Sequence, residues 1–213
     1  MLALLDGSDT EIVAILRIAA NAGEALFSSF AAAGPIEVEG VWPGPVSIPP
    51  QRHWSYGGMP AWWATIGLLV CLQDHARLAR MHALGAALPT NAPGIHPPPY
   101  FAPLTVAWTD LAVGKANPSA IEEALAAEAW DPSIFAERER PHLLAMRALL
   151  AGETRDFDTA MQALFEGLTR RYRMKWAFPD VRLSPIGLAL LALARRQGLP
   201  AGITSNYAPH LFP

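Results

Sequence analysis

The side chains best suited to metal binding or acid–base chemistry are six histidines and a few closely spaced carboxylates. Glu139 and His142 have the Glu-x-x-His spacing that di-metal helical bundles use. Those centres need a second such motif, and this sequence has one, with Pro141 inside it where we expect a helix to begin. His75 and His82 lie two turns apart on one predicted helix, about 10 Å along its axis, which is too far to share an ion. We therefore predict no metal site.

Residues for covalent or cofactor chemistry are equally sparse. The sequence has no Gly-x-x-x-x-Gly-Lys-Ser/Thr loop, no strand-anchored Gly-x-Gly-x-x-Gly and no Gly-x-Ser-x-Gly turn. Cys71 is the only cysteine, so no internal disulfide can form, and its apolar neighbours indicate a small buried hydrophobic residue. Ser205 has no acidic or basic partner nearby in the sequence. We expect no catalytic residues, no cofactor and no enzymatic activity.

A basic, aromatic segment at residues 170–176 (RRYRMKW) could follow phosphates and stack bases. The simpler explanation is that basic side chains stabilise the carboxyl end of a helix. The net charge of −3 argues against a polyanion-binding protein. Residues 1–51 contain six acidic side chains and only Arg17 as a base, so this quarter of the chain could attract a basic partner. We predict no binding to nucleic acid.

The composition predicts a large core in a protein without a membrane segment. Hydrophobic residues make up 52% of the 213 residues and charged residues 16%. No uninterrupted apolar stretch reaches the roughly 18 residues that cross a bilayer. The first residues are acidic and do not resemble a signal peptide, so we expect a cytoplasmic protein that does not bind membranes.

Capping residues mark most of the predicted helices. The first begins at the capping box Ser8-Asp9-Thr10-Glu11, and Gly34-Pro35 ends it. Three later helices begin at a capping residue followed by proline, and others are expected at 60–84 and 156–176. The last helix, Pro185 to about Gln197, is apolar almost all round and should be central. The three cap–proline pairs are Asn117-Pro118, Asp131-Pro132 and Ser184-Pro185.

The apolar residues of the first helix fall in one stripe at helical period, at Ile12, Ile15, Leu16, Ala19, Gly23, Leu26, Phe27 and Phe30.

Two proline-rich stretches, 34–60 and 89–103, interrupt the helices. Ile36-Glu37-Val38-Glu39 alternates like a strand and could form one short β-hairpin near 36–48. We find no repeat of fixed length. The sequence therefore predicts an all-α fold: a single domain spanning 1–213, built as an irregular bundle of about seven or eight helices.

The last third of the chain resembles the immunity protein 49 family, which protects bacteria from polymorphic toxins. The resemblance lies in LLAGETRDFDTAMQALFEGLTRRYR, which begins at Leu149, and in LSPIGLALLALARRQGLPAGITSNYAPHLF, which begins at Leu183. The middle of the chain, PAWWATIGLLVCLQDHARLARMHAL from Pro60, also resembles the family's tryptophan-bearing helix that ends in polar residues. A small-residue turn precedes an acid–phenylalanine helix, and a leucine-rich helix ends in a basic residue and glycine. The family's closing motif resembles Ser-Asp-Tyr-Leu-Pro, whereas this chain has Ser205-Asn206-Tyr207-Ala208-Pro209.

This resemblance implies a largely helical, non-enzymatic inhibitor that binds a cognate toxin in the bacterial cytoplasm. Many toxins act on nucleic acids through basic clefts, so we expect the acidic N-terminal region to face the toxin. The candidate partner-binding residues are Glu37, Glu39, Trp42 and Trp54. The alternatives are a helical scaffold or adaptor module, an enzyme with an unrecognised site, and a nucleic-acid binder that uses residues 170–176.

Overall fold

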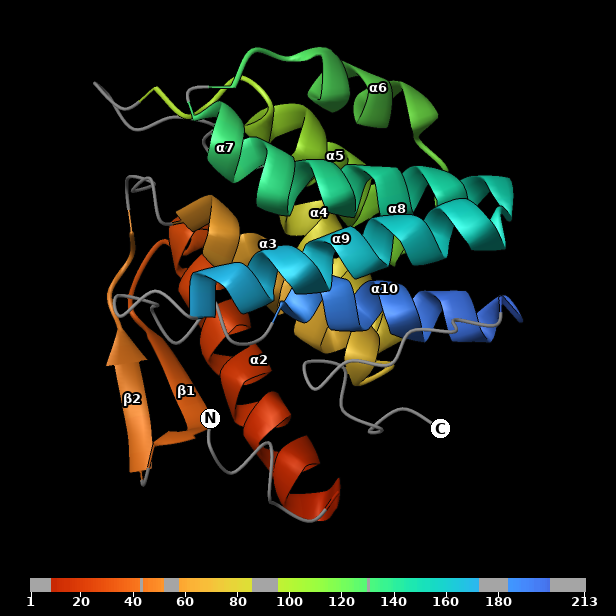
Figure 1. Cartoon of the computed structure of the whole chain (residues 1–213). Helices are drawn as coiled ribbons and strands as arrows, with labels where there is room; N and C mark the ends of the chain where they lie inside the picture. The colour runs from red at the N-terminus through yellow and green to blue at the C-terminus, as the bar shows by residue number, and fades with distance from the viewer. Residues whose placement is uncertain are drawn as a thin grey trace. The chain divides into compact units, whose positions relative to one another are not determined.

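The computed structural model describes residues 9–42, 44–51, 58–85, 96–129, 131–172 and 184–199. Within these ranges the chain is a set of α-helices with one two-stranded sheet, so the predicted all-α bundle with a small hairpin is confirmed (Figure 1). The chain packs as two compact units, which we call the N-terminal unit (Leu2–Pro97) and the C-terminal unit (Pro98–Pro213). Whether they behave as the single expected domain stays a prediction.

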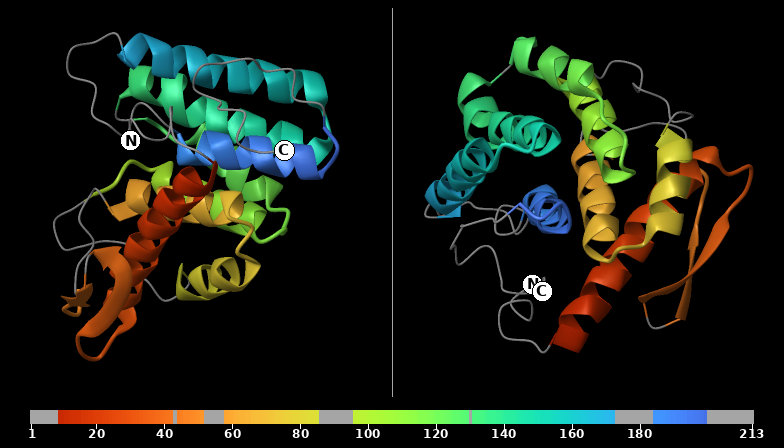
Figure 2. Two further views of the ribbon diagram at one scale, coloured as in Figure 1. Left: turned by 90° about the horizontal axis from the view of Figure 1, so that it is seen from below. Right: turned by 90° about the vertical axis from the view of Figure 1, so that its right-hand side faces the viewer.

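The N-terminal unit is built around one long helix. It contains α2 (Asp9–Ala31), β1 (Ile36–Trp42), β2 (Gly44–Ile48), α3 (Gly58–Cys71) and α4 (His75–Gly85). α2 packs against α3, and β1 lies between α2 and β2 (Figure 2). Phe27 of α2 meets Trp62 of α3 edge to face, with ring centroids 4.9 Å apart, and both side chains are fully buried. This aromatic pair fixes the crossing of the two helices.

The predicted hairpin forms at residues 36–48. Ile36 pairs with Ile48 and Val38 with Val46, and the register shifts before Trp42 pairs with Gly44. Gly44 has a φ of 109°, a conformation that L side chains rarely adopt, so glycine is needed at the turn. The alternation seen in the sequence is retained, because Ile36 and Val38 are half-buried whereas Glu37 and Glu39 are exposed.

The single helix expected at 60–84 is wrong: the chain forms two helices, α3 and α4, that break at residues 72–74. Gln73 has a φ of 56°, which ends α3 in the left-handed conformation that glycine or asparagine usually supplies. Asp74 then begins α4, because its carboxylate accepts a hydrogen bond from the backbone N–H of Arg77 at 3.1 Å.

The apolar stripe of α2 is only partly buried. Leu16 and Phe27 lie in the core, but Ala19 and Leu26, from the same predicted stripe, are exposed. Among the described residues, α2 is also the helix long and apolar enough to cross a membrane, over Val13–Ala31, and 28% of that stretch is buried. Arg17 and Glu24 divide this stretch, so the sequence shows no uninterrupted apolar run there.

The C-terminal unit is a helical assembly centred on one antiparallel pair. Its elements are α5 (Phe101–Ala112), α6 (Pro118–Ala126), α7 (Pro132–Ile134), the π-helical segment η1 (Phe135–Glu139), α8 (Arg140–Ala151), α9 (Thr154–Tyr172) and α10 (Pro185–Arg196). α8 and α9 pack side by side across a turn at Gly152, and α10 packs on α8. Eight of the twelve residues of α10 are buried, which confirms the prediction of a central closing helix. The start of the helix predicted at 156–176 lies two residues earlier, and residues 173–176 lie outside the described residues.

All three predicted cap–proline starts are confirmed. Asn117 accepts a hydrogen bond from the N–H of Ala120, Asp131 from those of Ser133 and Ile134, and Ser184 from that of Gly187. The expected helix start at Pro141 is wrong, because the helix runs on without a break from Pro132 to Ala151. η1 lies just before Pro141, which has no N–H to continue the α-helical ladder, and the chain accommodates the loss by widening to π-helical bonds.

Candidate functional site

Glu37 and Glu39 lie together on the exposed side of β1. They line a groove of about 280 Å³ between β1 and α2, which Asn21, Glu24, Ser28 and Arg77 also line. Neither carboxylate makes an ion pair within the part of the chain that the structure describes. Among the described residues, the groove therefore has two acidic side chains at its edge that no basic side chain neutralises.

Glu24, on the α2 side of the same groove, is already neutralised. Arg77 donates to one of its carboxylate oxygens, and Arg80 donates to the other at 2.9 Å. Asp74 lies 3.9 Å from Arg77 and completes the cluster. Because both arginines belong to α4, this network ties α4 to α2. Glu37 and Glu39 are the charges of the groove that no other described residue pairs with.

The side chains of the two tryptophans predicted beside these acids lie outside the described part of the structure. Trp42 is the last residue of β1, and its backbone pairs with Gly44, but its side chain lies outside the described residues. Trp54 lies in the segment 52–57, which is also outside them. Glu37 and Glu39 are thus the two predicted site residues whose side chains the structure places.

Sequence reasoning also missed the exposed side of α2, which lies next to this groove. Ile18 is 46% exposed and Leu26 is 36% exposed. The available signal was the excess width of the apolar surface. Ile18 and Ala22 lie outside the predicted stripe and, with its members Ile15 and Leu26, form a second apolar edge beside the one that packs on α3.

The Glu-x-x-His motif is buried rather than arranged to bind a metal. Glu139 is 1% exposed and His142 is 5% exposed, and Glu139 forms an ion pair with Arg138. Burial, and to a lesser degree the charge of Arg138, lowers the pKa of His142 to about 3. Among the described residues no group of three or more histidine, cysteine or carboxylate side chains could hold a metal ion.

His142 does contact a hydroxyl group, that of Ser184, with Nε2 and Oγ 2.9 Å apart. A serine–histidine pair is the arrangement of an activated nucleophile, but a histidine with a pKa near 3 is a poor base at neutral pH. Ser184 Oγ also accepts the backbone N–H of Gly187 at 3.0 Å, which caps α10. The pair therefore holds the start of α10 against α8.

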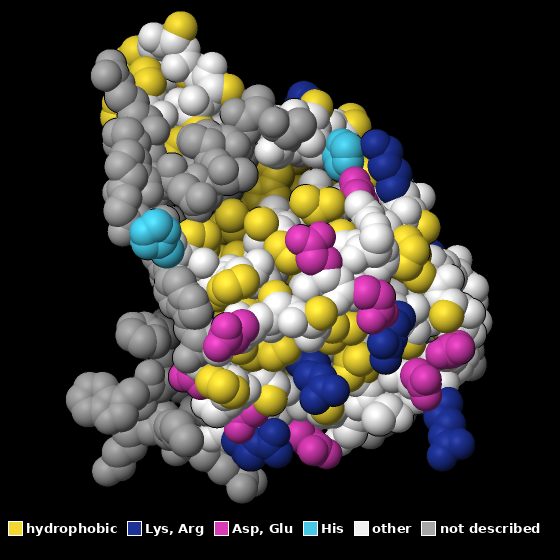
Figure 3. All heavy atoms as spheres, turned by 90° about the horizontal axis from the view of Figure 1, so that it is seen from above, with side chains coloured by type: hydrophobic (Ala, Val, Ile, Leu, Met, Phe, Trp, Pro, Cys, Tyr) yellow, Lys and Arg dark blue, Asp and Glu magenta, His cyan; other side chains and the backbone are white. Residues whose placement is uncertain are grey.

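The remaining candidate residues lie on different elements of the two units. His75 is exposed and His82 half-buried on α4, and Cys71 is half-buried at the end of α3 rather than fully buried. In the basic segment, Arg170 is exposed and lies 3.8 Å from Glu137, while residues 173–176 lie outside the described residues. Ser205 and Tyr207 of the tail also lie outside them. On the face in Figure 3, described basic and acidic side chains are interspersed, without a continuous basic surface.

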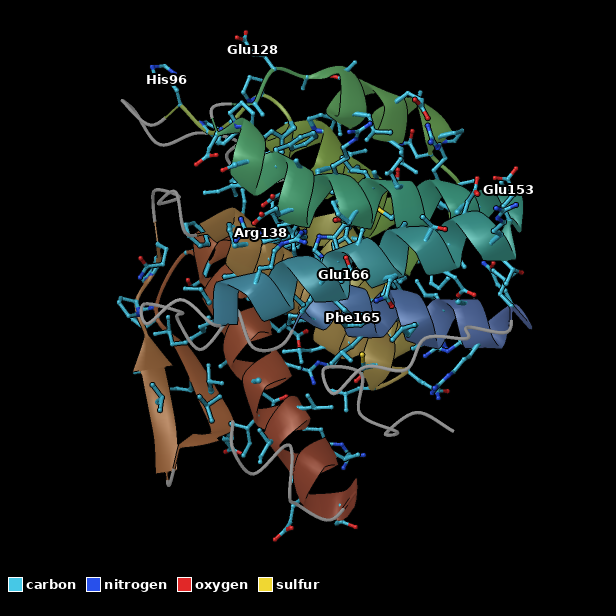
Figure 4. The ribbon with its side chains drawn as sticks, viewed as in Figure 1. His96, Glu128, Arg138, Glu153, Phe165 and Glu166 are labelled. Atoms are coloured by element: carbon cyan, nitrogen blue, oxygen red, sulfur yellow. The ribbon has the colours of Figure 1, made fainter. Side chains whose placement is uncertain are left out.

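A second groove, of about 290 Å³, lies between α8 and α9 in the C-terminal unit. Alanines form much of its floor, with Arg140 and Arg147 on the α8 side and Glu153 and Asp156 on the α9 side. Figure 4 labels Glu153 at the α8–α9 turn and Arg138 near the opposite end of this helix pair. Charges of both signs line this groove, so it has no preference for a basic or an acidic ligand.

Comparison with known proteins gives one match that covers almost the whole chain. The family model described as immunity protein 49 matches residues 4–211. No curated protein and no solved structure matches the chain. The match extends the resemblance to nearly all of the first 58 residues, which include the hairpin with Glu37 and Glu39. The chain therefore belongs to the immunity protein 49 family.

Proposed function

We propose that this protein is a bacterial immunity protein that binds a cognate toxin domain in the cytoplasm and neutralises it without catalysis. Membership of the immunity protein 49 family carries the proposal. The described residues are compatible with it, because they form packed helices with an unpaired acidic edge at Glu37 and Glu39. A rigid surface with complementary charge is what fast and specific protein binding requires.

We further propose that Glu37 and Glu39 belong to the toxin-binding face, together with Trp42 and Trp54. Two unpaired carboxylates beside a groove would speed the encounter with a basic toxin surface and fix its orientation. Tryptophan is the residue type that most often anchors such interfaces. The helical scaffold or adaptor remains the alternative, and no observation on the described residues favours it.

The function is tested by co-expression in a bacterial host with the toxin domain encoded beside this gene. We expect that the toxin domain alone stops growth and that this protein restores colony numbers by several orders of magnitude. A toxin domain with an inactivated active site is the control for the burden of expression. Loss of growth despite soluble protein at matched levels would contradict the proposal.

A further inference from the structure

The outward side of α2 carries an apolar stripe that neither α3 nor β1 covers. Its members are exposed or half-buried. Four of them follow one another at intervals of three and four residues, and Ala19 lies beside them, so the set covers one face over about three turns, or about 17 Å. We call this set the outer stripe; it consists of Ile15, Ile18, Ala19, Ala22 and Leu26. The opposite edge of the helix, with Leu16 and Phe27, packs into the core of the N-terminal unit.

An apolar stripe of this length is uncommon on a helix whose other side is already packed. Ile18 and Leu26 keep 46% and 36% of their surface exposed, and exposed apolar surface costs about 25 cal/mol per Å² relative to burial. Contiguous apolar surface with a polar border is typical of a site where a helix or another protein docks. The outer stripe thus has the form of an interface centre.

The charge around the outer stripe decides between possible occupants. β1 runs alongside α2 and presents the exposed Glu37 and Glu39, which make no ion pair with any other described residue. The N-terminal unit has seven acidic and four basic residues, and Glu24 engages two of the four bases, Arg77 and Arg80. A second copy of this chain would bring acid against acid, and an anionic lipid surface would be repelled in the same way. A basic protein surface is the complement.

The groove between α2 and β1 adds a specific place for such a charge. It lies beside the outer stripe and has a volume of about 280 Å³, enough for a lysine or arginine side chain. Asn21 and Ser28 line it as neutral polar groups, and the charges of Glu24 and Arg77, which also line it, offset each other in an ion pair. Glu37 and Glu39 supply the two further carboxylates of its lining. An occupant that places an apolar ridge on the outer stripe could therefore insert a cation next to it.

We propose that the outer stripe of α2 is the centre of the toxin-binding interface, with Glu37 and Glu39 as its charged rim. This inference rests on the proposed function. The partner surface it requires presents apolar side chains bordered by lysine or arginine. The apolar centre governs how long the complex lasts, and the acidic rim governs how fast it forms.

The test compares two equally exposed apolar residues in the full-length protein. Ile18→Lys alters the outer stripe, and Val106→Lys alters a site on α5 that is 47% exposed and lies in the other unit. Binding is measured by biolayer interferometry against the toxin domain encoded beside this gene. We expect Ile18→Lys to raise Kd at least tenfold through faster dissociation, and Val106→Lys to change Kd less than twofold. Leu26→Lys should behave like Ile18→Lys, and circular dichroism melts should confirm that all three variants fold.

A separate binding experiment tests the acidic rim formed by Glu37 and Glu39. Glu37→Gln combined with Glu39→Gln should slow association and flatten its dependence on salt, with a smaller change in the dissociation rate. If the wild type binds and protects while Ile18→Lys and Leu26→Lys bind within twofold of it, the inference is wrong and the proposed function stands. A wild type that neither binds nor protects overturns the proposed function itself. Ile18-dependent dimerisation in sedimentation, or Ile18-dependent binding to phosphatidylglycerol vesicles, would assign the stripe to another occupant.

Discussion

At the scale of single residues, His142 is a buried titratable group that contacts Ser184, the residue that caps α10. Its ring and the N–H of Gly187 share the hydroxyl oxygen of Ser184, so one serine serves both α8 and α10. Because the pKa of His142 lies near 3, the ring is neutral in the folded protein at any physiological pH. In the unfolded chain the same ring takes up a proton near pH 6.5.

The free energy of unfolding should therefore fall as the pH drops below 6.5. The contribution of His142 is complete above pH 6.5 and decreases toward pH 3, by up to about 1.4 kcal/mol per pH unit, because only the unfolded chain binds the proton in that range. Urea unfolding at pH 7.5 and pH 5.5 should differ by about 1.4 kcal/mol from this residue. In His142→Gln that part of the difference should vanish. An unchanged pH dependence in the variant would show that His142 is not buried in its neutral form.

At the scale of secondary structure, the helix from Pro132 to Ala151 shows how one proline shapes a contact. Pro141 cannot donate the α-helical hydrogen bond to the carbonyl of Glu137, four residues earlier. α9 passes close to this carbonyl at Gly167, where an added Cβ would lie 2.5 Å from the oxygen. Glycine at 167 is thus required by the close approach of α9 to η1 rather than by its own backbone angles.

Gly167→Ala should destabilise the C-terminal unit although alanine is the better helix former. Overpacking costs roughly 1–3 kcal/mol, and a Cβ 2.5 Å from a backbone oxygen belongs at the upper end, because no side-chain rotation relieves the clash. That cost exceeds a helix-propensity gain of about 1 kcal/mol. Glu166→Ala is the matched control, because it changes the neighbouring exposed position on α9 (Figure 4) and should shift stability by less than about 0.5 kcal/mol. Both are measured by urea unfolding. Equal stability of the two variants would mean that the helices are farther apart than described.

What the sequence could predict follows from the range of the interactions. The three cap–proline starts involve residues within three positions of one another, so the pattern alone is sufficient. The break between α3 and α4 was missed because Gln73, and not glycine, adopts the left-handed conformation.

The candidate site was predictable only in part, because some of its features depend on contacts between residues far apart in the sequence. The alternation at residues 36–39 places Glu37 and Glu39 on the exposed side of a strand. The groove beside them depends on where α2 meets β1, and the division of the α2 stripe into buried and outer edges depends on α3. These are contacts between elements that no local pattern contains.

At the scale of the whole chain, the two units differ in charge. Leu2–Pro97 has seven acidic and four basic residues, whereas Pro98–Pro213 has twelve of each, so the N-terminal unit carries the entire net charge of −3. The uneven distribution gives the N-terminal unit a long-range attraction for cations, while the C-terminal unit is neutral. The proposed toxin-binding surface lies in the unit that carries this charge.

The central claim is that the protein neutralises its toxin by occupying it rather than by changing it chemically. The most direct measurement is a titration of the purified toxin domain's activity with increasing amounts of this protein. We expect the activity to fall linearly and to reach zero near one molar equivalent, as tight binding requires. The toxin should recover full activity after it is separated under denaturing conditions and refolded. Progressive inactivation by far less than one equivalent, with no recovery after separation, would contradict the account and indicate an enzyme.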